Sequence, residues 1–216
     1  MAKKKSFLGA TIFDGFKRHL NSALIIKNNK VVEIIPEEKI DPEIEQIVLA
    51  GGLLTPGFID LQVNGGGGVL FNDNPSLENL KTICEAHAKL GSTSIMPTLI
   101  SDSPELNKKA TLAITDALDQ QINGLVGLHL EGPHLALARK GAHKEDFIRP
   151  MKEFDCLELE SLANKVPNLM LTIAPEAASL QQITRLSKAG AIISLGHTDC
   201  TFNQAAEAVC AGATCA

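Results

Sequence analysis

Residues 128–133 read Leu-His-Leu-Glu-Gly-Pro, an apolar strand pattern that ends on a carboxylate and then a turn. Alternation along a strand places His129 and Glu131 on one face. A glutamate buried at such a position is costly unless a cation or hydrogen-bond donor meets it. Residues 192–197, Ile-Ile-Ser-Leu-Gly-His, repeat the pattern and end on a potential metal ligand, His197. The two stretches predict strands that deliver Glu131 and His197 to one rim of a sheet.

Apolar strand-like runs alternate with helix-like segments after Pro56. The runs lie at 58–63, 93–99, 125–131, 169–174 and 191–197. Such alternation is typical of βαβ units and a parallel sheet. It predicts an α/β fold with the first five to six strands of a (β/α)8 TIM-type barrel, whose complete form takes about 250 residues. A doubly wound open sheet is the alternative on pattern alone.

The helices of this region carry start and stop signals. Ser103 precedes Pro104 and an acidic residue, which predicts an N-cap followed by a proline at the first helical position. Thr201 and Gln204 have the spacing of a capping box, and Gly212 is placed to end that helix.

The first part of the chain follows short β patterns instead. Apolar residues at 23–26 and 31–35, joined by a polar turn, predict a hairpin that ends at Pro36. Residues 44–54 predict a further strand with a bend at the two glycines 51 and 52. We therefore predict a small β domain, part of a β-sandwich, at residues 1–54 and the N-terminal part of a barrel at 55–216. The lysines at 3–5 are predicted to form a solvated tail.

Composition and charge exclude several classes of partner. The 216 residues are 44% hydrophobic with a net charge of −5, so the chain can bury a core but offers no basic surface for nucleic acid or anionic lipid. No apolar run spans a bilayer, and the N-terminus lacks the long apolar segment of a signal peptide. The five cysteines contain no Cys-x-x-Cys pair, which favours reduced thiols and a cytoplasmic location.

Several polar residues lie at or near the predicted strands. Asp60, Gln62 and Asn64 share one face of the first strand and are expected to line the interior, either as a hydrogen-bonded polar layer or as part of a site. The four glycines that follow at 65–68 lack the lysine of a phosphate-binding loop, so tight loop packing explains them better.

Each candidate residue also has a purely structural interpretation. Glu131 taken alone could be a salt-bridged core carboxylate, and His129 is expected to be a hydrogen-bonded core histidine rather than a ligand. His197 is the better ligand candidate because neutral imidazole binds zinc and similar ions. His143 lies in the loop after the third strand, on the same rim, where it could reach a substrate or simply be solvated.

Seven short motifs after Leu54 carry a family resemblance. They are Pro-Gly-Phe-Ile-Asp-Leu-Gln-Val-Asn-Gly at 56–65, Phe-Asn-Asp at 71–73, Pro-Thr-Leu at 97–99, Gly-Leu-His-Leu-Glu-Gly-Pro at 127–133, Lys-Gly-Ala-His at 140–143, Ala-Pro-Glu at 174–176 and Gly-His-Thr at 196–198. In residues and order they resemble the N-acetylglucosamine-6-phosphate deacetylases of the amidohydrolase superfamily. The resemblance implies hydrolysis of N-acetylglucosamine 6-phosphate to glucosamine 6-phosphate and acetate.

The resemblance also implies roles for individual residues. Glu131 and His197 would be metal ligands, and Ala142 and His143 would contact the sugar, with Gln62, Asn64 and His129 as further residues that could line the site.

The superfamily usually opens its first strand with His-x-His, whereas this chain has Gln62 and Asn64 there, as some deacetylases do. The resemblance therefore implies one divalent ion per subunit. Zinc is the first candidate, and iron, manganese, cobalt and nickel are the alternatives. A homodimer is expected for the full-length protein.

Other family residues would lie beyond residue 216: a further histidine ligand, the catalytic aspartate and the phosphate-binding residues. No catalytic residue is therefore assigned in this chain. The polypeptide alone is expected to bind metal weakly and to release no acetate. The alternatives are another amidohydrolase, such as a dihydroorotase-like or allantoinase-like enzyme, and a non-catalytic half-barrel that binds a sugar phosphate. Gln62 and Asn64 argue against the first.

Overall fold

The computed structural model describes residues 3–216, and the chain divides into two compact units, Met1–Gly57 and Phe58–Ala216. We call them the β unit and the barrel unit. The division lies at Gly57, where the sequence predicted it after Leu54. In residues 3–216 no helix is both long enough and apolar enough to cross a lipid bilayer.

The β unit contains two small sheets, one with strand order β5-β4-β1-β6 and one with order β3-β2-β7. Its strands are β1 (Lys4–Leu8), β2 (Thr11–Phe13), β3 (Arg18–His19), β4 (Ser22–Lys27), β5 (Lys30–Pro36), β6 (Glu45–Val48) and β7 (Leu53–Leu54), with a 3-10 turn η1 (Glu37–Lys39) after β5. The predicted hairpin is confirmed as the antiparallel pair of β4 and β5. Its turn uses Asn28 and Asn29 at positive φ, a conformation that asparagine tolerates better than most residues.

The prediction of a solvated tail is wrong for Lys4 and Lys5, which begin strand β1 between β4 and β6. Their ammonium groups stay at the surface, where Lys4 lies 3.8 Å from Glu33 of β5, the strand beyond β4, and Lys5 lies 3.1 Å from Glu45 of the neighbouring strand β6. A charged triplet can therefore belong to a strand, because lysine stems run along the sheet while the charged ends remain in water.

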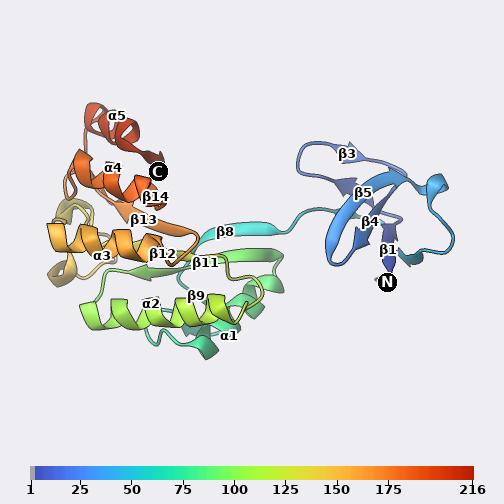
Figure 1. The fold of residues 1–216 in the computed structure, drawn as a ribbon, viewed down its shortest axis with the longest axis horizontal. Helices are drawn as coiled ribbons and strands as arrows, with labels where there is room; N and C mark the ends of the chain where they lie inside the picture. Colours follow the sequence, from blue (N-terminus) through green and yellow to red (C-terminus); the bar gives the residue numbers. More distant parts are fainter. Residues whose placement is uncertain (1–2) are drawn as a thin grey trace. The chain divides into compact units, whose positions relative to one another are not determined.

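The barrel unit is built on a six-stranded parallel sheet in which every strand pairs with the next one along the chain (Figure 1). In chain order its strands are β8 (Phe58–Val63), β11 (Ser92–Ile100), β12 (Leu128–Glu131), β13 (Leu169–Ile173), β14 (Ile192–Leu195) and β15 (Ala213–Cys215), with the short pair β9 (Gly65–Gly66) and β10 (Val69–Leu70) after the first. A doubly wound sheet would reverse its strand order. The sequential order confirms the first six strands of a (β/α) barrel.

Five helices connect these strands in the chain, and they lie along the outside of the curled sheet (Figure 1). They are α1 (Leu77–Ala88), α2 (Pro104–Asp119), α3 (Glu153–Ala163), α4 (Leu180–Lys188) and α5 (Phe202–Ala211). The predicted caps are confirmed: the Ser103 hydroxyl accepts from the Leu106 amide at 3.2 Å, and Thr201 and Gln204 form a capping box. Between sheet and helices lies one apolar core that includes Ile95, Leu128 and Leu171.

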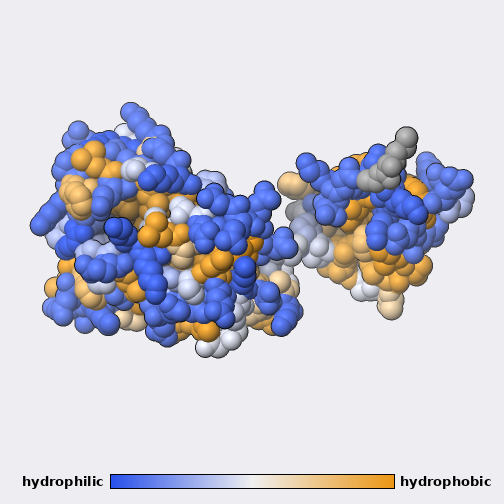
Figure 2. Space-filling model, turned by 60° about the horizontal axis from the view of Figure 1, so that its bottom comes forward, coloured by the Kyte–Doolittle hydropathy of each residue, from blue (hydrophilic) through white to orange (hydrophobic). Residues whose placement is uncertain are grey.

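Exposed apolar side chains occur on both units (Figure 2). On β8, which is an edge strand, Phe58 and Ile59 are 69% and 68% exposed. In the β unit, the apolar side chains of Phe16, Val31 and Val48 are also largely exposed to solvent. Edge strands with apolar side chains are favourable places for further strand pairing.

Asp155 anchors the beginning of α3. Its carboxylate accepts hydrogen bonds from Arg149 at 2.6 Å and from the Lys152 amide at 2.8 Å. Burial raises the pKa of Asp155, but these bonds outweigh burial and hold the pKa below its ordinary value. The stabilisation is therefore present above the ordinary aspartate pKa and is lost as pH falls below it.

We expect Asp155→Asn to lower the free energy of unfolding by about 2 kcal/mol at neutral pH, because Arg149 loses its charge partner. Urea unfolding at pH 7 and at successively lower pH would measure this, and the gap to wild type should narrow with falling pH. Asp119→Asn, at an exposed aspartate of α2, is the control and should change stability by less than about 0.5 kcal/mol. A gap that stays constant down to acid pH would contradict the assignment.

Candidate metal and substrate site

Glu131 and His197 lie at the carboxyl ends of two strands of the barrel unit. Glu131 is the last residue of β12, and His197 follows β14 by two residues. Strand β13 lies between them and is parallel to both, so all three strands end at the same edge. The structure brings the two side chains together, with Glu131 Oε1 2.9 Å from His197 Nε2.

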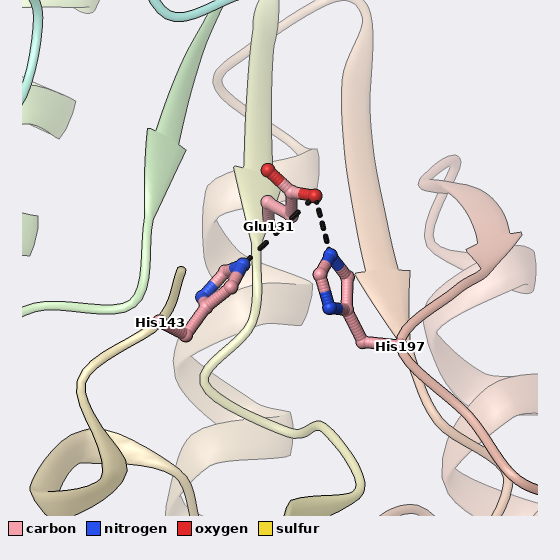
Figure 3. A group of neighbouring side chains, drawn as sticks. All are labelled: Glu131, His143 and His197. Atoms are coloured by element: carbon pink, nitrogen blue, oxygen red, sulfur yellow. Dashed lines mark hydrogen bonds and ion pairs between the residues drawn. The ribbon is translucent and has the colours of Figure 1, made fainter. Parts of the chain in front are cut away.

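His143 completes a group of three that we call the rim cluster (Figure 3). It lies between the 3-10 turns η2 (Leu137–Arg139) and η3 (Glu145–Phe147), and its ring is buried. His143 Nε2 is 3.9 Å from Glu131 Oε1, and the ring meets that of His197 edge to face with centroids 4.6 Å apart. One potential ligand atom from each residue lies within 4.8 Å of the others.

Hydrogen bonding determines which nitrogen of His197 carries a proton. His197 Nδ1 lies 2.8 Å from the carbonyl oxygen of Arg139, which can only accept, so Nδ1 is the donor. In the neutral ring, the Nε2 lone pair then faces the Glu131 carboxylate. Two electron-rich atoms at that distance need a proton or a metal cation between them. A carboxylate and an imidazole are ligands of zinc and similar divalent ions, so these residues fit such an ion.

The charge state of Glu131 suits this role. Burial raises the pKa of this carboxyl, but the imidazoles of His143 and His197 outweigh burial and lower the pKa to about 2. Gln62 Nε2 donates to the other carboxylate oxygen at 3.2 Å. Glu131 is therefore an ionised, oriented carboxylate throughout the neutral range.

A cavity of about 340 Å³ opens in front of the rim cluster, a volume that suits a small ligand. Its lining residues are Gln62, Asn64, Leu70, Asn72, Ile100, Glu131, Ala142, His143 and His197. The structure thus places Gln62, Asn64, Ala142 and His143 around the same space as the two ligand candidates. A larger groove of about 900 Å³ lies between α2 and α3 and shares none of these residues.

Comparison with known proteins yields closely similar relatives, although no protein-family model matches the chain. N-acetylgalactosamine-6-phosphate deacetylase of Shewanella sp. (strain ANA-3) is 42% identical over 166 residues, which are 77% of this chain and 42% of the relative. N-acetylglucosamine-6-phosphate deacetylase of Haemophilus influenzae is 36% identical over 215 residues, which are 98% of this chain and 55% of the relative.

A crystal structure agrees with these sequences. N-acetylglucosamine-6-phosphate deacetylase from Pasteurella multocida superposes with a TM-score of 0.92 at 34% identity, over 98% of this chain and 55% of that one. Over the part that it spans, the chain is similar in sequence and in fold to N-acetylglucosamine-6-phosphate deacetylases. It spans about half the length of the curated relatives it matches.

His129 does not line the cavity, contrary to one of the expectations for it. The ring is buried, and both nitrogens have partners: Nδ1 lies 3.1 Å from the Leu61 carbonyl oxygen, and Nε2 lies 2.7 Å from the Thr172 hydroxyl. Burial lowers the pKa of His129. His129 is the core histidine of the structural interpretation, located one layer below Glu131. Asp60 does not line the cavity either.

Sequence reasoning assigned no role to two polar residues at or beside the cavity. Asn72 lines the cavity and binds both backbone groups of Ile100, at 3.1 Å each. Ser101, directly after β11, contacts His143 Nδ1 through its hydroxyl at 2.8 Å. The available signal for Ser101 was its position at the end of the second barrel strand, where side chains reach the same edge as Glu131.

Proposed function

We propose that the full-length protein hydrolyses the acetamido group of an N-acetylhexosamine 6-phosphate, with N-acetylglucosamine 6-phosphate as the first candidate. Water adds across the amide C–N bond and gives acetate and the free amine. The observation that carries the proposal is the Glu131 carboxylate facing the His197 Nε2 lone pair at 2.9 Å beside a cavity of ligand size. The names of the relatives support the substrate class.

We infer that Glu131 and His197 are two ligands of one divalent ion, with zinc as the first candidate. When bound, such an ion polarises an amide carbonyl and lowers the pKa of a coordinated water. Gln62 orients the Glu131 carboxylate, and His143 and the small side chain of Ala142 form the wall against which the sugar would lie. No general acid or base is assigned within this chain.

The test is acetate release by the complete product of the reading frame that encodes this chain. We expect release with added zinc and loss of release after chelation, with one equivalent of metal bound per subunit. Two substrates should be assayed side by side, N-acetylglucosamine 6-phosphate and N-acetylgalactosamine 6-phosphate, which differ only at C4. Each of them appears in the name of one of the relatives. A metal-loaded protein that binds these sugars without cleaving them would favour the non-catalytic binder and overturn the proposal. The 216-residue polypeptide alone is expected to release no acetate.

Glu176 holds the loop that carries His197, and we expect Glu176→Gln to weaken zinc binding about tenfold. Its carboxylate accepts from the Thr198 hydroxyl at 2.5 Å and from the Asp199 amide at 2.6 Å. A neutral amide is a weaker acceptor for both groups, so the imidazole would lose part of its fixed orientation. Titration calorimetry with zinc measures the effect. Glu145→Gln, at an exposed residue of η3, is the control, and equal affinities in the two variants would contradict this role.

We propose a cytoplasmic location and a homodimer for the full-length protein. All five cysteines are free thiols in the structure, as suits a reducing compartment. The dimer is supported by the family resemblance. Sedimentation equilibrium of the complete product would test it, and a monomer at micromolar concentration would refute it.

A further inference from the structure

Ser101 presents two hydrogen-bonding groups to one nitrogen of His143. The Ser101 amide N–H donates to His143 Nδ1 at 3.2 Å, and the Ser101 hydroxyl lies 2.8 Å from the same atom. The hydroxyl is farther, at 3.5 Å, from the Glu131 carbonyl oxygen. Both Ser101 and His143 are buried, so water does not compete freely for these groups.

These contacts fix the tautomer of His143. A backbone N–H is always a donor, so the nitrogen that receives it must offer a lone pair. In the neutral ring the proton then sits on Nε2, the atom that faces Glu131 and the cavity. His143 therefore has the opposite tautomer from His197, whose proton is on Nδ1.

We infer that Ser101 is a positioning residue that holds His143 as a hydrogen-bond donor toward the substrate, so that His143 is not a third metal ligand. This inference rests on the proposed function for the identity of the substrate. The N–H at Nε2 blocks the lone pair that a metal would need. It suits an oxygen acceptor of a bound sugar instead.

The backbone beside Ser101 is shaped to leave room for the hydroxyl. Gly132 has a φ of +84°, and a Cβ at this position would lie 2.2 Å from Ser101 Oγ. Glycine is the residue that accepts this conformation and leaves the space open. The turn after Glu131 therefore fixes the carboxylate and also accommodates the group that orients His143.

The first test reads the tautomer directly, in the metal-free protein. Long-range ¹⁵N–¹H spectra of ¹⁵N-histidine-labelled protein distinguish a protonated ring nitrogen from an unprotonated one, and the signals absent from His143→Gln identify His143. We expect an unprotonated Nδ1 and a protonated Nε2 in the neutral ring. A protonated Nδ1 would overturn the inference. This measurement needs neither metal nor turnover.

The second test separates positioning from metal binding. In the complete product, Ser101→Ala should raise KM for the N-acetylhexosamine 6-phosphate about tenfold, the equivalent of one hydrogen bond, with a smaller change in kcat. Zinc affinity should stay within about twofold of wild type. Ser101→Thr keeps the hydroxyl and should bring KM most of the way back to the wild-type value. Ser161→Ala, at an exposed serine of α3, should leave KM unchanged.

The outcomes distinguish the two proposals. An unchanged KM in Ser101→Ala, or a zinc affinity that falls as far as kcat/KM does, would overturn the role of Ser101. A wild-type protein that cleaves neither sugar phosphate would end the proposed function, while the spectra would still decide the tautomer.

Discussion

Glu131→Gln is expected to abolish stoichiometric zinc binding and to reduce deacetylation by the complete protein roughly a thousandfold, equivalent to about 4 kcal/mol. The substitution keeps the shape of the side chain but removes the negative charge. That charge is what faces the His197 lone pair at 2.9 Å, and the carboxyl is ionised at neutral pH because its pKa is about 2. A neutral amide offers the cation only a weak oxygen ligand and no charge.

Two measurements check this prediction. Metal analysis after dialysis should find one equivalent of zinc on the wild type and none on Glu131→Gln. Added zinc should raise the melting temperature of the wild type and leave that of the variant unchanged, since only a folded state that binds a ligand is stabilised by it. Glu145→Gln, a surface control, should behave as the wild type. A variant that retains one equivalent of zinc would remove Glu131 from the ligand set.

His197→Gly is expected to be more stable than His197→Ala by about 1 kcal/mol, although both variants lose zinc binding. His197 has a φ of +50°, in the left-handed region where a side chain with a Cβ is strained. Glycine relieves this strain and alanine does not. The wild type thus holds a disfavoured backbone conformation at the residue that meets Glu131, which is common at functional sites.

His87 offers a matched comparison, because it lies within α1 in ordinary helical conformation. There the order should reverse, with alanine more stable than glycine by about 0.5–1 kcal/mol. Urea unfolding of the four variants measures both differences. Equal stabilities of His197→Gly and His197→Ala would show that the backbone at this position carries no strain.

The strands and their ends were predictable because they depend on local pattern. Apolar runs between helix-like segments predicted β8, β11, β12, β13 and β14 to within a few residues, and strand ends predicted that Glu131 and His197 would share an edge. Once the strands are known to be parallel, the handedness of their crossover connections and the common edge at which they end follow from general rules.

The rest of the site depends on contacts that no local pattern contains. His143 is buried because the 3-10 turns η2 and η3 fold its loop back onto Ser101, 42 residues earlier in the chain. His129 shares a strand face with Glu131, so alternation alone could not separate them. The interior of a barrel is filled in layers from different strands, and the layer of His129 is filled by Thr98 and Thr172 from the neighbouring strands.

The absent side chain of Gly132 has an evolutionary consequence. A methyl group there would occupy the place of the Ser101 hydroxyl. Substitutions at positions 101 and 132 should therefore be correlated rather than independent. In a saturation library of both codons, survivors with alanine at 132 should carry glycine or alanine at 101, and sugar-phosphate affinity would decline in step with them. A substitution table that treats each site independently would misjudge both.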